Sequence, residues 1–281
     1  MSSRPFLLLA ILGSMLVLIG AFVTQLEPRD AALGKAPAAL PGFLQEASGL
    51  AKVDERLLLT HNDEKGHIYS IALPSLQITK LVSLGNPVVL DDFEGIAVSG
   101  DRVYMITSTG KLYVIPNVSF TAANQLASWS ILDTGLAAVC EVEGLHFDDG
   151  KLLIPCKNIY KRNGKKKSGK DRVTVYSYAP GEDAVASEFF SLNDDLLKGN
   201  KKKVTGIGSD LNFYYFLTPA NVLRVNRHTL SFQLLPLDSA VHKQPEGIAI
   251  MKNGSVYLVD DRKDGAGGLS HYKNLEFVSN F

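Results

Sequence analysis

The chain has 281 residues, of which 46% are hydrophobic and 21% are charged, and its 29 basic residues balance its 29 acidic ones. Zero net charge excludes a simple electrostatic grip on nucleic acid, because such binding needs an excess of basic residues to displace counterions. The high apolar content, with 13 Phe and 10 Tyr, excludes a disordered chain.

The N-terminus carries an apolar segment long enough to span a membrane. Residues 6–23 contain no charged side chain, and a helix of this length extends about 27 Å, close to the thickness of a bilayer core. Arg4 precedes the segment and charges of both signs follow it, so the positive-inside rule predicts a cytoplasmic stub over residues 1–5. A signal peptide is the alternative, although no small-residue cleavage site precedes Thr24.

Residues 24–45 are rich in Ala and Pro and show no sustained hydrophobic period, which is typical of a spacer. The folded domain is therefore predicted to span residues 46–281. We expect a single-pass protein of the inner (cytoplasmic) membrane whose domain lies in the periplasm or outside the cell.

A short motif recurs five times in the predicted domain: an acidic or hydroxyl residue, a glycine and an aliphatic residue. The glycines are separated by 46, 49, 62 and 41 residues and are Gly49, Gly95, Gly144, Gly206 and Gly247. Each motif is followed by short β-branched or aromatic runs between turn signals, which indicates about four strands per repeat. The second runs are 56–59, 102–107, 151–156, 213–217 and 255–259.

This period predicts an all-β fold, a single β-propeller of five blades, and the long third interval leaves room for a sixth. A β-sandwich has no reason to repeat one short motif, and no 3.6-residue period indicates a helical solenoid. In the last repeat, residues 269–272 and 275–278 are expected to be the outer strands.

Propeller geometry brings polar residues together at one rim of the central channel. The first strand of each blade lines the axis, so the residues before the motif glycines should meet there. These residues are Ser48, Glu94, Glu143, Thr205 and Glu246. The second strand is antiparallel to the first, so its end returns to the same rim and adds Asp63 and Asp260, while Asp92 lies just before Glu94.

Carboxylates held this close repel one another, and a bound cation removes that cost. Ca²⁺ takes six to eight oxygen ligands in adaptable geometry. The candidate calcium ligands are therefore Glu94, Glu143, Glu246, Asp63, Asp92 and Asp260. The alternative is that the glutamates cap backbone donors or pair with Lys157 or Arg262.

Two cysteines flank the hairpin expected to turn at residues 148–150. In an oxidising compartment Cys140 and Cys156 are a candidate disulfide, although their register looks about two residues out of step. Two reduced, packed cysteines are the alternative. Of the histidines, His61 and His146 could face the channel and act as a general base, or serve as polar structural residues.

Residues 161–170 contain six basic side chains and no acidic one. This composition predicts a solvated loop, and the alternative is a contact with anionic lipid headgroups or glycans.

Four strings resemble the SdiA-regulated, or YjiK/CarP, family: EASGLA at 46–51, DDFEGIAV at 91–98, EVEGLHFDDGKLLIPCK at 141–157, and PEGIAI with VYLVDD at 245–250 and 256–261. The resemblance implies a five-bladed propeller in the bacterial envelope that is linked to calcium binding or calcium homeostasis. It supports an ion-binding role for Glu94, Glu143 and Glu246 and carries over no catalytic residue. The chain departs from the pattern at Thr205, where the family has an acid.

The expected function is thus a membrane-anchored, extracytoplasmic propeller that binds Ca²⁺ at the channel rim for sensing, homeostasis or scaffolding. Its protein or small-molecule partner is not specified by the sequence. The alternative is a calcium-dependent hydrolase, a phytase-like phosphoesterase or a lactonase, in which His61 or His146 would act beside the metal.

Overall fold

A computed structural model describes residues 37–160, 172–181, 185–193, 203–261 and 267–275. The chain divides into two units, residues 1–30 and 31–281, and the described residues all belong to the second. The predicted anchor at 6–23 and the basic loop at 161–170 lie outside the described residues and stay predictions. Within the described part of the chain, no helix has the length and hydropathy of a membrane span.

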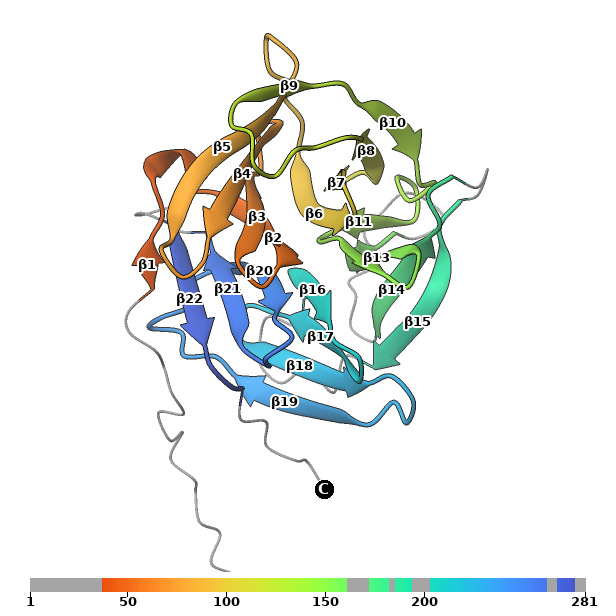
Figure 1. The fold of residues 1–281 in the computed structure, drawn as a ribbon. Coiled ribbons are helices and arrows are strands. Elements are labelled where there is room, and N and C mark those ends of the chain that lie inside the picture. The colour runs from red at the N-terminus through yellow and green to blue at the C-terminus, as the bar shows by residue number, and fades with distance from the viewer. Residues whose placement is uncertain (1–36, 161–171, 182–184, 194–202, 262–266, 276–281) are drawn as a thin grey trace, which may run out of the picture. The chain divides into compact units, whose positions relative to one another are not determined.

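Five β-sheets are arranged around one axis (Figure 1), as predicted for a five-bladed propeller. The first two blades, from the axis outwards, are β2 (Ala47–Asp54), β3 (Leu57–Asn62), β4 (His67–Ala72) and β5 (Gln77–Leu84), then β6 (Phe93–Ser99), β7 (Arg102–Thr107), β8 (Lys111–Ile115) and β10 (Ser130–Asp133). A short strand that the sequence analysis did not predict, β9 (Gln125–Ala127), pairs in parallel with β5.

The third blade starts with two short strands, because the chain leaves the ladder between them. Its strands are β11 (Cys140–Val142), β12 (His146–Asp148), β13 (Lys151–Ile159), β14 (Arg172–Tyr178) and β15 (Ser187–Asn193). The fourth blade contains β16 (Gly206–Ser209), β17 (Phe213–Leu217), β18 (Asn221–Asn226) and β19 (Phe232–Pro236). The fifth contains β20 (Pro245–Ile250), β21 (Val256–Asp260), β22 (Gly268–Tyr272) and β1 (Ala38–Ala39).

The N-terminal strand β1 closes the ring, since Ala38 and Ala39 pair with Leu269 and Gly268 of β22. The 3-10 helix η1 (Gly42–Leu44) follows and buries Leu44. The prediction that residues 24–45 form a spacer was therefore wrong for residues 38–44. The outermost strand of the fifth blade is β1 rather than the expected 275–278, of which only residue 275 is described.

The hydrophobic core lies between the blades. In the described residues it forms five clusters, and each one joins two neighbouring blades. In the first cluster, for example, Ile68 of the first blade packs with Met105 of the second. Each blade is therefore stabilised by the apolar faces of its neighbours, which ties ring closure to stability.

The inner strands approach one another backbone to backbone at the motif glycines. A Cβ atom on Gly95 would lie 2.5 Å from the Leu145 nitrogen and 2.6 Å from the Gly144 carbonyl carbon. A Cβ atom on Gly247 would lie 2.7 Å from the Leu50 nitrogen. No side chain fits at these distances, which explains why glycine occupies these two positions of the repeat.

Replacing Gly95 with alanine is expected to lower the free energy of unfolding by about 3 kcal/mol, because the new methyl group meets backbone atoms that cannot move aside. Urea denaturation followed by circular dichroism measures the loss. The matched control is Gly42→Ala, since nothing lies within 4 Å of a Cβ atom there. Equal stability of the two variants would contradict the close approach.

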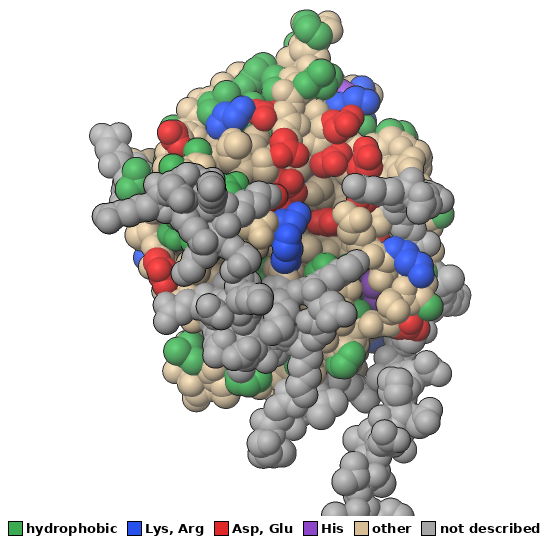
Figure 2. All heavy atoms as spheres, turned by 180° about the vertical axis from the view of Figure 1, so that it is seen from behind, with side chains coloured by type: hydrophobic (Ala, Val, Ile, Leu, Met, Phe, Trp, Pro, Cys, Tyr) green, Lys and Arg blue, Asp and Glu red, His purple; other side chains and the backbone are tan. Residues whose placement is uncertain are grey.

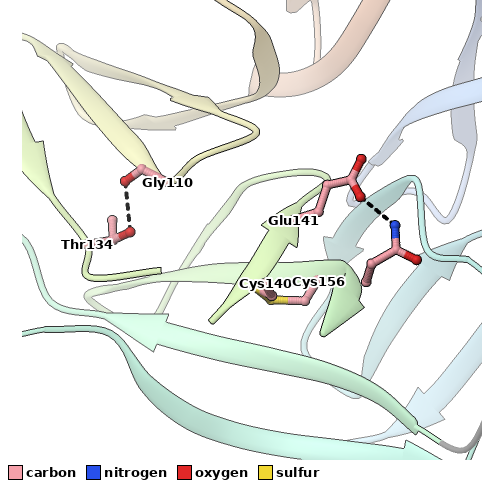
Figure 3. Close-up of a disulfide and its surroundings, with 6 residues drawn as sticks. Gly110, Thr134, Cys140, Glu141 and Cys156 are labelled. Carbon is pink, nitrogen blue, oxygen red and sulfur yellow. Dashed lines mark hydrogen bonds between the residues drawn. A yellow bond between two sulfur atoms is a disulfide. The ribbon is translucent and has the colours of Figure 1, made fainter. Parts of the chain in front are cut away.

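Cys140 and Cys156 form a disulfide between β11 and β13 (Figure 3). The expected offset is present, because Cys156 lies opposite Val142 while Cys140 lies opposite Ile159. The register shifts between Glu141 and Val142, and the two cysteine Cα atoms are 5.8 Å apart. This separation suits a disulfide, so the offset does not prevent the bond. The bridge fixes the strand that leads directly into Glu143.

The bridge closes a loop with a sequence separation of 16. Its removal in the Cys140→Ser, Cys156→Ser double variant is expected to cost about 3 kcal/mol of stability, because the unfolded chain gains freedom. Urea denaturation with and without a reductant checks this: the reductant should destabilise the wild type and leave the variant unchanged. A wild type that is indifferent to the reductant would contradict a bonded pair.

Candidate functional site

The strand register places the two predicted sets of rim residues at the same ends of their sheets. The start of each inner strand pairs with the end of the second strand, as in Ala47 with Asn62 and Pro245 with Asp260. Figure 2 shows acidic side chains gathered on one face of the molecule, with basic side chains among them. We call the set Glu94, Glu143, Glu246 and Lys157 the acidic rim.

Lys157 is the cation that the three rim glutamates share. Its ammonium group forms an ion pair with Glu143, whose side chain is only 2% exposed, whereas that of Lys157 is 28% exposed. Burial lowers the pKa of Lys157, but Glu143 and then Glu246 and Glu94 outweigh this effect and raise it. The pairing of a glutamate with Lys157, which the sequence analysis left open, is therefore present.

The other two rim glutamates are poorly compensated. Burial and then repulsion from Glu143 and Asp92 raise the pKa of Glu94 to about 9. Burial and then repulsion from Glu143 raise the pKa of Glu246 to about 8, although Gln244 donates a 2.9 Å hydrogen bond to it. Both groups are thus protonated at pH 7, because a single ammonium cannot offset two buried carboxylates and a third that is partly buried.

Glu143 also has an unsatisfied oxygen. Its Oε1 accepts from Lys157, while its Oε2 is buried and has no hydrogen-bond partner. A buried polar atom without a partner costs free energy, and a ligand that contacts it recovers that cost. As the side chains stand, the described residues include no group of three His, Cys, Asp or Glu arranged to hold a metal ion. Binding of a metal by these glutamates therefore requires their side chains to rearrange.

The two hydroxyl residues of the predicted rim make different contacts. Ser48 donates a long hydrogen bond of 3.4 Å to Glu94 Oε2. Thr205 donates to the Pro245 carbonyl oxygen at 2.5 Å and so joins the fourth and fifth blades. The blade that lacks an acid therefore contributes a structural contact instead of a carboxylate.

Three further aspartates were predicted as metal ligands. Asp92 accepts a hydrogen bond from Ser108 and contributes to the raised pKa of Glu94. Burial, followed by repulsion from Glu46 and Glu64, raises the pKa of Asp63 to about 6. Asp63 therefore lies in the same acidic region, on the side of the first blade.

The prediction for Asp260 was wrong, because its side chain points into the protein. Its Oδ2 lies 2.8 Å from His242 Nδ1, and both side chains are fully buried. His242 Nε2 in turn contacts the Tyr272 hydroxyl. The next residue, Asp261, is the one whose charge raises the pKa of Glu246. Asp260 is the last residue of β21 and Asp261 lies beyond the strand, so the alternation of strand residues did not distinguish the two.

The two predicted histidines make hydrogen-bond contacts with groups other than the rim carboxylates. His61 is fully buried, its Nδ1 lies 3.0 Å from the Asn62 carbonyl oxygen, and its ring occupies the space next to Gly49. His146 Nε2 lies 2.8 Å from Ser209 Oγ on the neighbouring blade. Burial lowers the pKa of each to about 4, so both are neutral at pH 7.

The channel below the rim is nearly closed. The motif glycines and the aliphatic residues that follow them line an axial hollow of about 10 Å³. This volume is about the least that holds a single water molecule. At the level of the motif glycines the axis therefore has room for about one water molecule.

Neither a protein-family model nor a curated protein sequence matches the chain. Among solved structures it is similar to the PQQ-bound aldose sugar dehydrogenase from Streptomyces coelicolor, with a TM-score of 0.53, 10% identity, and coverage of 85% of this chain and 96% of that one. It is also similar to Myxococcus xanthus glutaminyl cyclase, with a TM-score of 0.50, 15% identity, and coverage of 86% and 94%. These likenesses establish the propeller fold alone.

The pKa values of the rim predict how stability depends on pH. Glu94 and Glu246 titrate near 9 and 8 when folded and near 4.5 when unfolded. Between these values the folded state binds more protons, so stability falls as pH rises. From pH 7 to 9 we expect a loss of up to about 1.4 kcal/mol per pH unit for each retained proton.

Urea denaturation in EDTA at pH 7, 8 and 9 measures this slope. Glu94→Gln removes one of the titrating groups and should flatten it, whereas Glu188→Gln at an exposed site of the third blade should not. Stability that stays constant or rises over this range in the wild type would contradict the raised pKa values.

Proposed function

We propose that the protein is a calcium-binding propeller and that its acidic rim holds one Ca²⁺ in a sensing, homeostasis or scaffolding role. The observation that carries the proposal is the convergence of three carboxyl groups on one ammonium, and two of these carboxyl groups hold their protons at pH 7 until a cation replaces them. Three carboxylates and one ammonium sum to −2 when all are ionised, and they lie in a largely buried space. A divalent cation neutralises this charge and offers a partner to the orphaned Glu143 Oε2.

The donor set favours Ca²⁺ over other metals. The described rim offers carboxylate oxygens and no thiol, because both cysteines are in the disulfide, and this chemistry suits a hard cation. The three glutamates come from three different blades, so their side chains adjust independently. Ca²⁺ tolerates such adaptable geometry, whereas Mg²⁺ demands a near-ideal octahedron.

Lys157 acts in this proposal as an internal cation that competes with Ca²⁺. It is part of the second strand of its blade, and its side chain is partly exposed, so the ammonium group can turn towards solvent when Ca²⁺ enters. The protons held by Glu94 and Glu246 must leave at the same time. Calcium affinity should therefore rise with pH.

Two features support an extracytoplasmic location. The Cys140–Cys156 disulfide suits an oxidising compartment. The apolar residues 6–23 suit a single-pass anchor in the inner membrane. Contact of the basic residues 161–170 with anionic lipid or glycan belongs to the same proposal. The hydrolase alternative gains no support from the two histidines, because His61 Nδ1 contacts the Asn62 carbonyl oxygen and His146 Nε2 contacts Ser209 Oγ.

Titration of the full-length protein with Ca²⁺ tests the proposal. At pH 8 we expect one Ca²⁺ per chain and a rise of several degrees in melting temperature, because Ca²⁺ binds only the folded state. The double variant Glu94→Gln, Glu246→Gln should lose both signals, whereas Glu188→Gln should keep them. The absence of binding heat and of a thermal shift at millimolar Ca²⁺ would contradict the calcium site.

Removal of the competing cation should strengthen calcium binding. In Lys157→Met the side chain keeps a similar length and loses its charge, so we expect at least about tenfold higher Ca²⁺ affinity by isothermal titration. Lys157→Arg keeps the charge and should bind Ca²⁺ much as the wild type does. Weaker binding in Lys157→Met would show that the lysine positions the carboxylates instead of competing with the metal.

A further inference from the structure

A cavity of about 350 Å³ lies beside the first blade, outside the four residues of the acidic rim. It is formed where the chain crosses from β1 to β2, at Gly42 to Glu46, and by the turn between β3 and β4. This volume falls within the range of small-molecule sites, near its lower end. We call it the crossing cavity.

One wall of the crossing cavity is aromatic. The ring of Phe43 stacks on Tyr69, with the ring centroids 4.8 Å apart and the planes inclined by 21°. Tyr69 is buried, but Phe43 is 51% exposed even though it belongs to the folded domain. The stack holds the Phe43 ring in place and leaves much of its surface available to a ligand in the cavity.

The remaining walls carry a negative charge. Glu46 and Glu64 line the cavity against a single ammonium, that of Lys65. His67 also lines it, and burial, followed by the nearby Lys80 and Lys65, lowers its pKa. Two carboxylates beside an exposed aromatic face therefore form a site with an excess of negative charge.

We propose that the crossing cavity binds the ammonium group of a small organic ligand. The Phe43 ring attracts a cation through its quadrupole, and the carboxylates of Glu46 and Glu64 attract it through their charge. A neutral polyol leaves the carboxylates uncompensated, and an anion is repelled by them. A metal ion gains little from the aromatic wall, so we expect an organic cation in this cavity. The cavity shares no residue with the acidic rim, so this proposal is independent of the calcium site.

Choline and its carbon isostere 3,3-dimethylbutan-1-ol are matched probes, since they share a shape and differ in charge. Isothermal titration of the full-length protein in EDTA should show millimolar or tighter choline binding, with the isostere at least about tenfold weaker. Phe43→Leu should weaken choline binding by about tenfold, because it keeps apolar bulk and removes the ring. Phe189→Leu changes an exposed aromatic of the third blade and should have no effect.

Three outcomes would overturn the proposal. Equal affinity for choline and its isostere would show that the cavity does not recognise the positive charge of the ligand. Binding that survives Phe43→Leu would place choline elsewhere. No choline binding at tens of millimolar would remove the site. The variant Glu246→Gln separates this proposal from the calcium site, since it should lose Ca²⁺ binding and keep choline binding, and loss of choline binding there would move choline to the acidic rim.

Discussion

The close approach of the five inner strands at their motif glycines is the constraint on which the rest of the structure depends. Because Gly95 and Gly247 leave no room for a Cβ atom, neighbouring strands meet backbone to backbone. The residue before each motif glycine therefore lies at one narrow rim, whether or not it is charged. The same contact nearly closes the axial hollow, which has a volume of about 10 Å³.

Bringing Glu94, Glu143 and Glu246 together at one rim has an electrostatic cost, and the charge of Lys157 offsets only part of it. Lys157 compensates Glu143, while Glu94 and Glu246 remain protonated at neutral pH. Groups with strongly raised pKa values that lie together in a largely buried cluster are more typical of a functional site than of a stabilising one. The zero net charge of the chain therefore conceals an acidic face that exists only once the blades are assembled.

The regular parts of the fold could be predicted because they follow periodic patterns. The bounds of β7 and β17 agree with the runs 102–107 and 213–217 read from the sequence. By contrast, β1 consists of two alanines whose pairing depends on ring closure, so no local pattern reveals it. At the rim, backbone geometry predicted which residues converge. It could not predict which way Asp260 points, because that depends on a register shift near Pro245, nor which of the glutamates pairs with Lys157.

The most direct test of a rim that exchanges protons for a metal is the number of protons released on calcium binding. Isothermal titration with Ca²⁺ at pH 7, in buffers that differ in ionisation enthalpy, gives this number. Glu94 and Glu246, with pKa values of about 9 and 8, must both ionise to become ligands, so between one and two protons should leave per Ca²⁺. Calcium binding with no proton release would contradict the account.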